Sequence, residues 1–482
     1  MTDSTAPDRA AADVPGPLVV DAEWVRALAH RGPSLRVLGA PGTGKTRLAV
    51  EIVATRVATG ELSAEECLLL AASRRSAGGL RDAVTMRLAA TTREPLARTF
   101  ASLGFGILRR AAVLADLPTP RLLSGPEQDV ILGELLAGHR LDPRSAPAWP
   151  DDLGEALTTR GFRAELRDLL MRAVERGVNP EELAGLGERV GRPEWVAAAQ
   201  VLREYDEVTA LSRPGAYDPA WIVTGASDAL EDVPGLLDGL RRQVRLVVVD
   251  DAQEVTASGA RLLGILARAG VSIVLLGDPD CAVQTFRGAD PEFLGHGWRD
   301  LHPGAETVRL RRGHRLPSAV SEVVARVPGL VGAVGGARHR APVAARAGGD
   351  VAVHQFRSAA AEAGFVADVA RRAHLLGGVP WSAMAVVVRG QARAATIRRV
   401  LSSAHVPVAP DDTGGPVRDE EAVRPLLTVL RVALERRAVR AAASPECLDA
   451  DPDAGWTLRP EVAVDLLTSP YAGADAVTLR RL

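Results

Sequence analysis

The sequence contains almost no lysine and very little cysteine. Lysine and arginine together number 58 among its 482 residues, yet Lys45 is the only lysine. The three cysteines, Cys67, Cys281 and Cys447, stand far apart and form no C-x-x-C pair. This pattern excludes a disulfide framework and a cysteine metal site, and it suits a reducing cytoplasm, where we expect the protein to act.

Long apolar runs and an excess of one charge are also missing. No apolar stretch approaches the roughly 18 residues that a membrane helix needs, so we expect a soluble protein with no membrane partner. Residues 1–16 are polar and lack the apolar core of a signal peptide, which predicts a disordered lead-in. Because the formal net charge is only −2, a nucleic-acid partner would have to be held by a local groove.

The single lysine lies in GAPGTGKT, which follows the pattern G-x-x-x-x-G-K-[ST] of a phosphate-binding loop. Glycines let consecutive backbone N–H groups point at phosphates, the ammonium reaches the terminal phosphates, and a threonine hydroxyl suits Mg²⁺. The apolar run SLRVLG before the loop and the helical stripe of Leu48, Ile52 and Val53 after it disfavour a chance turn. We expect the nucleotide to be held by Gly39, Ala40, Pro41, Gly42, Thr43, Gly44, Lys45 and Thr46.

Acidic residues follow two later apolar runs. RLVVVDD ends in Asp250 and Asp251, which predicts a strand-end carboxylate for Mg²⁺ beside the loop. VSIVLLGDPD ends similarly, and Phe286 and Arg287 follow in a turn. An exposed aromatic beside an arginine suits stacking on an unpaired base, whereas a core phenylalanine is the alternative interpretation.

Strand-like and helical patterns alternate along most of the chain, which predicts an α/β fold with parallel sheets. We expect a first domain at residues 17–108 and 240–303, interrupted by a helical insertion at 109–239. A second α/β domain is expected at 304–411, with strands at VAVHQF and AMAVVVR. Residues 412–482 read as the start of a second helical insertion that is truncated.

The order of the motifs resembles the UvrD/Rep/RecB group of superfamily-one DNA helicases. They run GAPGTGKT, LLLAASRRSAGGLRDAVTMRL, RTFASLGFGILRR, VVVDDAQE, LLGDPDCAVQTFRGADP and LRRGHRLP. The resemblance implies two RecA-like domains, ATP and Mg²⁺ as cofactors, and 3′-to-5′ movement on single-stranded DNA.

SRRSA, TFASLGFGILRR and the closing LLTSPYAGADAVTLRRL are most similar to AdnA-type subunits of the actinobacterial AdnAB helicase–nuclease. This finer resemblance implies processing of double-strand DNA ends, in recombinational repair, as a heterodimer with an AdnB-like subunit. It also implies that an arginine-finger motif and a nuclease domain lie beyond residue 482, so that this chain would not complete an active site alone.

The family resemblance assigns roles to matching residues. Lys45 and Thr46 would hold phosphate and Mg²⁺, Asp250 the metal, and Asp251 would take the catalytic-base position. Arg315 would contact the γ-phosphate, and Glu362 would approach the ribose. The single-strand path would be lined by Ser73, Arg74, Thr99, Phe100 and Phe286.

Four positions of the nucleotide site depart from the family pattern. Trp24 stands where an adenine-reading glutamine is usual, and His314 replaces an adenine-stacking tyrosine. Asp251 is one methylene shorter than the usual glutamate, and Cys281 replaces a γ-phosphate-sensing glutamine. We therefore expect nucleotide binding to survive better than hydrolysis. Three functions remain open: a motor subunit, a non-catalytic ATP-binding DNA clamp, and a stand-alone UvrD-type repair helicase.

Overall fold

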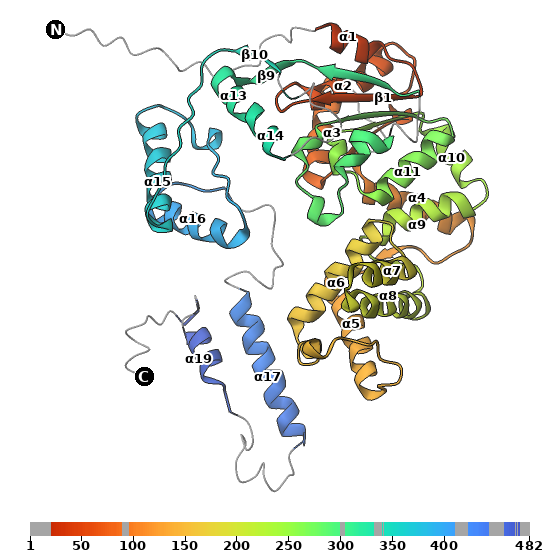
Figure 1. Cartoon of the computed structure of the whole chain (residues 1–482), viewed down its shortest axis with the longest axis vertical. Coiled ribbons are helices and arrows are strands. Elements are labelled where there is room, and N and C mark those ends of the chain that lie inside the picture. The colour runs from red at the N-terminus through yellow and green to blue at the C-terminus, as the bar shows by residue number, and fades with distance from the viewer. Residues whose placement is uncertain are drawn as a thin grey trace, which may run out of the picture. The chain divides into compact units, whose positions relative to one another are not determined.

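The computed structural model describes residues 21–88, 96–298, 304–331, 340, 342–409, 423–442, 457–467, 469 and 471–472 (Figure 1). They fall into two compact units, which divide between Ala352 and Val353 and are treated separately below. The expected lead-in at residues 1–16 lies outside the described residues.

The first unit is built on a six-stranded parallel sheet with the order β3-β2-β6-β7-β1-β8. The strands are β1 (Ser34–Gly39), β2 (Cys67–Ala71), β3 (Ala97–Thr99), β6 (Leu246–Val249), β7 (Ser272–Gly277) and β8 (Glu306–Leu310). β1, β2 and β6 are buried along their whole length, as expected for continuous apolar runs in a sheet that is covered on both faces. This confirms the parallel α/β fold predicted from the sequence.

Alternate residues of each strand enter two hydrophobic cores on opposite faces of the sheet. Leu246 and Val248 of β6 enter one core, whereas Val247 and Val249 enter the other. The first core is covered by α1 (Ala22–Ala29), α2 (Lys45–Ala58) and α3 (Arg74–Leu88). The second is covered by α4 (Phe100–Leu114), α9 (Trp221–Asp232), α10 (Leu236–Gln243) and α11 (Ala257–Arg268).

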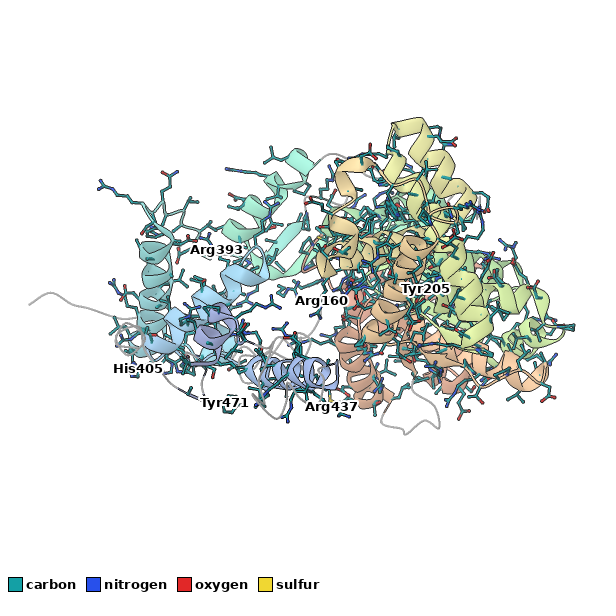
Figure 2. All side chains as sticks on the ribbon, turned by 90° about the horizontal axis from the view of Figure 1, so that it is seen from below. Arg160, Tyr205, Arg393, His405, Arg437 and Tyr471 are labelled. Carbon is teal, nitrogen blue, oxygen red and sulfur yellow. The ribbon has the colours of Figure 1, made fainter. Side chains whose placement is uncertain are left out.

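A separate helical segment is inserted between β3 and β6. It consists of α5 (Gly125–Leu141), α6 (Arg160–Glu175), α7 (Pro180–Val190) and α8 (Pro193–Ser212), with a short pair of strands, β4 (Arg121–Leu122) and β5 (Ala216–Tyr217). These helices share a core of their own, in which Tyr205 of α8 is almost fully buried (Figure 2). The helical insertion is shorter than the predicted range of residues 109–239. The difference arises because α4, α9 and α10, which lie partly or wholly within that range, pack on the sheet.

The predicted boundary between the two α/β domains, at residue 304, does not coincide with the end of the first unit in the structure. β8 pairs in parallel with β1, and its Val308 and Leu310 are buried in the first core, so this strand completes the first sheet. The first unit then continues through β9 (Arg312–Pro317), α13 (Ser318–Arg326), α14 (Pro328–Val331) and β10 (Val343–Arg346), with β9 and β10 paired to each other.

The second unit contains α15 (Ala359–Leu375), α16 (Gln391–Ser403), α17 (Arg424–Ala442) and α19 (Pro460–Leu467). α15 and α16 share a small core. The expected strands VAVHQF and AMAVVVR are wrong: neither forms a strand among the residues described for this unit. Their Val353 and Val387 are 90% and 92% exposed, and an apolar run forms no strand without a neighbour to pair with.

Candidate nucleotide and DNA sites

The loop GAPGTGKT joins the end of β1 to the start of α2. Gly42 and Gly44 have φ angles of 83° and 87°, a region that L-residues with side chains rarely adopt. A Cβ atom at Gly39 would lie 2.4 Å from Thr43 Oγ1, which itself donates a hydrogen bond to the carbonyl of Ala40 at 2.8 Å. The glycines of the motif are therefore required by this backbone path.

Lys45 is the first residue of α2, and its side chain turns back over the loop. Nζ donates to the carbonyl oxygens of Gly39 at 2.6 Å and Ala40 at 3.2 Å. The ammonium and the free N–H groups of the first turn of this 14-residue helix thus lie at one place. A helix N-terminus with a fixed cation is a favourable position for a phosphate chain.

Asp250 follows β6 and is 4% exposed. Burial, followed by the neighbouring Asp251 charge, raises the pKa of the Asp250 carboxyl to about 6, while a hydrogen bond from Thr46 opposes this shift. Its Oδ1 atom is buried and has no hydrogen-bond partner among the described residues. A buried carboxylate oxygen without a donor, beside a threonine hydroxyl at a phosphate loop, fits the set of ligands that Mg²⁺ uses with a nucleotide.

Asp251 has a left-handed backbone conformation, with φ at 53°. Its Oδ1 accepts a hydrogen bond from Gln253 Nε2 at 3.2 Å. The Gln253 oxygen in turn accepts from the backbone N–H of Asp278, at the end of β7, at 3.1 Å. Sequence analysis missed Gln253, and its only signal was a polar residue placed two positions after the acidic pair.

Cys281 lies in the turn that follows β7. Its Sγ donates to Asp278 Oδ2 at 3.3 Å. Burial and the Asp278 charge raise the pKa of the Cys281 thiol to about 12, so the thiol is protonated at neutral pH. Nearby, Arg340 forms a bidentate ion pair with Asp280, and both side chains are largely buried. This pair fixes the turn that carries Cys281.

Trp24, His314 and Arg315 all approach the loop from outside it. A Cβ atom at Gly44 would lie 3.2 Å from the Trp24 ring and 3.8 Å from His314, and one at Gly42 would lie 3.2 Å from Arg315 Cβ. The backbone N–H of His314 donates to the Gly42 carbonyl at 2.8 Å. Burial lowers the pKa of the His314 imidazole. The structure thus places these three residues of the predicted site against the loop.

Glu362 belongs to the second unit. It lies in the first turn of α15, where it forms an ion pair with Arg393 of α16. Arg393 is labelled in Figure 2. The predicted approach of Glu362 to a ribose therefore stays a prediction.

Four of the five predicted DNA-contacting residues line one pocket of about 280 Å³. Ser73 caps α3, because its hydroxyl accepts from Ser76 N–H at 3.1 Å, and Thr99 caps α4 by accepting from Ser102 N–H at 3.2 Å. Arg74 and Phe100 are the first residues of the same two helices. Two helix N-termini with an arginine face this pocket, an arrangement that favours a phosphate.

Phe286 lies beside this pocket. Its side chain is 69% exposed, so it is not part of the core. The Arg287 guanidinium lies 5.4 Å from the Phe286 ring centroid, and Arg287 and Gln284 both line the pocket. The turn is held by Glu254, whose carboxylate accepts from the backbone N–H groups of Val283 and Gln284 at 2.8 and 2.9 Å. Gln284 and Glu254 were not predicted from the sequence.

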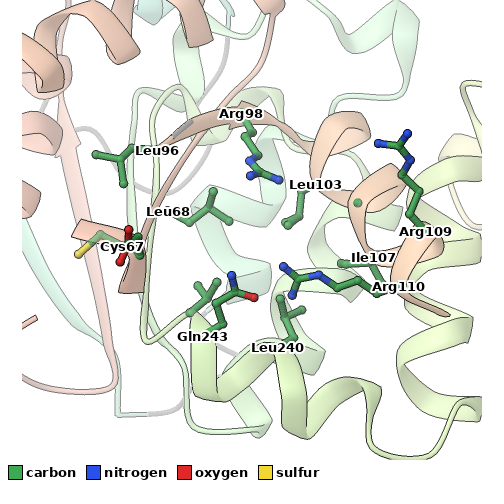
Figure 3. Close-up of a pocket in the computed structure, with 13 residues that line it drawn as sticks. Cys67, Leu68, Leu96, Arg98, Leu103, Ile107, Arg109, Arg110, Leu240 and Gln243 are labelled. Carbon is green, nitrogen blue, oxygen red and sulfur yellow. The ribbon is translucent and has the colours of Figure 1, made fainter. Parts of the chain in front are cut away.

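Another pocket, of about 470 Å³, lies near the start of β2, at the amino ends of the strands (Figure 3). Arg98 and Arg110 point into it from above and from the side, over the apolar side chains of Leu68, Leu103 and Leu240. None of the residues predicted to bind nucleotide or DNA lines this pocket. The predicted sites are thus grouped at the carboxyl edge of the strands, where open α/β sheets bind ligands.

Together, the parallel sheet, the phosphate loop and the strand-end aspartate define a RecA-like P-loop nucleotide-binding protein. Residues 20–300 match the model of the UvrD/REP helicase N-terminal domain. The chain belongs to the UvrD/REP helicase family.

Several curated proteins are similar to this chain. ATP-dependent DNA helicase UvrD2 of Mycobacterium tuberculosis is 27% identical over 460 residues, which cover 91% of this chain and 62% of that protein. DNA helicase II of Escherichia coli is 23% identical over 61% of this chain and 38% of its own length. ATP-dependent DNA helicase PcrA of Staphylococcus epidermidis is 22% identical over 83% of this chain and 52% of its own. The chain therefore spans less than two thirds of the length of these relatives.

No cluster of three or more histidine, cysteine or carboxylate ligands is present among the described residues. No helix in the described part of the chain is long and apolar enough to cross a bilayer.

Proposed function

We propose that this chain is the ATP-binding motor part of a DNA helicase that moves along single-stranded DNA. The supporting observation is that the nucleotide and DNA candidate sites share one edge of one sheet. The loop follows β1 and Asp250 follows β6, while Ser73 lies just beyond the end of β2 and Thr99 is the last residue of β3. β6 pairs with β2, so a change at the nucleotide can reach the DNA pocket through adjacent strand ends.

The residues of the loop supply binding and charge compensation. Backbone N–H groups of residues 42–46 and the Lys45 ammonium hold the phosphates, and Thr46 and Asp250 hold Mg²⁺. When bound, Mg²⁺ neutralises charge that develops on the phosphate oxygens. Arg315, fixed beside Gly42 by the His314–Gly42 hydrogen bond, supplies a cation near the terminal phosphate.

Hydrolysis by this site is proposed to be slow. Asp251 orients the attacking water, but its carboxylate is one methylene shorter than glutamate and is tied to Gln253. A displacement of about 1 Å in such a group lowers rates by on the order of 100-fold. The protonated thiol of Cys281 supplies one weak donor, which does not replace an amide next to a γ-phosphate.

We further propose an AdnA-type role, in which this chain pairs with a stronger AdnB-like motor at double-strand breaks. Two features support the proposal that activity depends on a partner: the AdnA-like sequences of the motifs and the altered residues of the nucleotide site. A stand-alone UvrD-type helicase is favoured by the alignment with mycobacterial UvrD2 along 91% of this chain. A non-catalytic clamp is favoured by Asp251, Cys281 and His314 acting together.

ATP turnover by the chain, with and without an AdnB-like partner subunit and a single-stranded 30-mer, distinguishes the three functions. A stand-alone helicase predicts robust DNA-stimulated turnover. The AdnA-type motor predicts weak turnover, stimulated by DNA, together with nucleotide-dependent DNA affinity. A clamp predicts binding of both ligands with no stimulation. Displacement of streptavidin from oligonucleotide ends then measures direction, and 3′-to-5′ movement requires faster release from the 5′ end.

A further inference from the structure

A pocket on the helical segment combines aromatic and acidic side chains. It has a volume of about 520 Å³ and lies between the loop after α5, helix α6 and the first turn of α8. Its aromatic members are Trp149, Phe162 and Trp195. Its carboxylates are Asp152, Glu165 and Glu194, and none of the described residues that line it is basic.

Helix α6 presents one stripe to this pocket. Phe162, Glu165, Leu166 and Leu169 are spaced as i, i+3, i+4 and i+7, so they share a helix face. The Phe162 ring packs edge-on against Trp149, with centroids 5.2 Å apart and an interplanar angle of 82°. Phe162, Trp149 and Trp195 also pack against the core of the segment while remaining partly exposed. Their orientation is therefore fixed before any ligand arrives.

The charges of the pocket are only partly balanced. Glu194 forms an ion pair with Arg192 at 2.9 Å. Asp152 and Glu165 are exposed and have no ion-pair partner within the described part of the chain. The pocket thus presents two carboxylates that form no ion pair among the described residues, together with aromatic faces held by packing.

We propose that this pocket binds an arginine side chain, flanked by apolar residues, on a segment of a partner protein. A guanidinium stacks on aromatic faces and donates to carboxylates at the same time, which matches both features of the lining. Leu153, Leu169 and Pro193 supply apolar contacts for the flanking residues. Nucleic acid is disfavoured because the lining holds carboxylates and no basic residue. The candidate DNA pocket also contains Glu175 and Glu254, but there Arg74 and Arg287 offset their charge. This surface is independent of the motor function proposed above.

The test uses the 482-residue chain labelled with 5-fluorotryptophan, whose seven tryptophans give separate fluorine NMR signals. Signals of Trp149 and Trp195 are assigned with Trp149→Phe and Trp195→Phe. The probe is the peptide acetyl-Leu-Arg-Leu-amide, and its matched control carries citrulline, which keeps the shape and loses the charge. We expect the arginine peptide to shift these two signals and to leave that of the buried Trp298 in place. The citrulline peptide should bind about two- to fivefold more weakly, since a cation over an exposed aromatic face contributes about 0.5–1 kcal/mol.

Charge variants separate this site from a non-specific apolar surface. The double variant Asp152→Asn, Glu165→Gln should raise the peptide Kd by about fivefold, whereas Glu207→Gln, an exposed carboxylate of α8 outside the pocket, should not change it. Unchanged melting temperatures exclude misfolding of these exposed variants. Equal binding of the two peptides, or uniform movement of all tryptophan signals, would overturn the proposal. A single-stranded oligonucleotide that shifts the Trp149 and Trp195 signals would overturn it in favour of a nucleic-acid site.

Discussion

The side chain of Gln253 holds Asp251 through a hydrogen bond of 3.2 Å between its Nε2 atom and Oδ1 of the aspartate. The same glutamine accepts the backbone N–H of Asp278, so it links the ends of β6 and β7. Asp251 itself has a left-handed backbone, which aspartate tolerates better than most residues. The position of this carboxylate is thus set by its backbone and by one neighbour, and lengthening the side chain changes its reach in a defined direction.

We expect Asp251→Glu to raise the hydrolysis rate of this site. The longer side chain brings the carboxylate closer to the attacking water, so kcat should rise more than KM changes. The left-handed backbone should lower the melting temperature slightly, because it favours glutamate less than aspartate. Steady-state hydrolysis by the chain assembled with its proposed partner, whose own phosphate loop is disabled, measures the effect, with Asp251→Asn as the matched variant that removes the charge. Cys281→Gln is added in a double variant, and a flat rate in all of them would show that these two residues do not limit turnover.

The raised pKa of Asp250 should make the stability of the protein depend on pH. Its folded pKa of about 6 lies above the usual value for aspartate, so the protonated form is favoured in the fold. In the nucleotide-free protein this group therefore lowers stability as the pH rises from about 4 to above 6. Asp250→Asn should stabilise the protein by about 1–3 kcal/mol at pH 8 and by little at pH 4.

The same variant should lose Mg²⁺-dependent nucleotide affinity, and the wild-type affinity should fall below pH 6. Thermal melts and nucleotide titrations over pH 4–8 provide the data. A stability difference that does not change with pH would remove Asp250 from this account.

Phe286→Ala should weaken single-stranded DNA binding and spare ATP binding. Base stacking on an aromatic side chain contributes roughly 1–3 kcal/mol, which corresponds to about a 5- to 150-fold loss of affinity. Fluorescence anisotropy with a labelled oligonucleotide measures it. Phe356→Ala, which changes a partly exposed phenylalanine of the second unit, is a matched control. Equal affinity of wild type and the Phe286 variant would exclude a stacking role.

Local sequence patterns were sufficient to predict the strand, loop and helix that form the candidate nucleotide site. The loop, its lysine and the aspartate after β6 depend on short-range chemistry, in which glycine conformations and a strand-end position are visible in a few residues. The fold class followed from continuous apolar runs such as SLRVLG and CLLLA, which only a sheet covered on both faces can bury.

Local sequence patterns could not predict which strands pair with each other or which polar residues, distant in the sequence, are in contact. No strand was predicted at β8, and only its pairing with β1 assigns it to the first sheet. VAVHQF is similarly apolar but finds no neighbouring strand. Gln253, Glu254 and the Asp280–Arg340 pair act across 25 to 60 residues of sequence, and no local spacing predicts such contacts.

We expect GAPGTGKT to form a working nucleotide site around Lys45, the only lysine of the sequence. Calorimetric titration with Mg²⁺ and a non-hydrolysable ATP analogue, on wild type and Lys45→Ala, tests it most directly. Among the described residues, Lys45 Nζ donates hydrogen bonds to two loop carbonyls at 2.6 and 3.2 Å and forms no ion pair, so its removal should leave the fold and the melting temperature nearly unchanged. We predict measurable heat and saturation with the wild type and no detectable binding by the folded variant. Equal affinity of the two proteins would contradict the account.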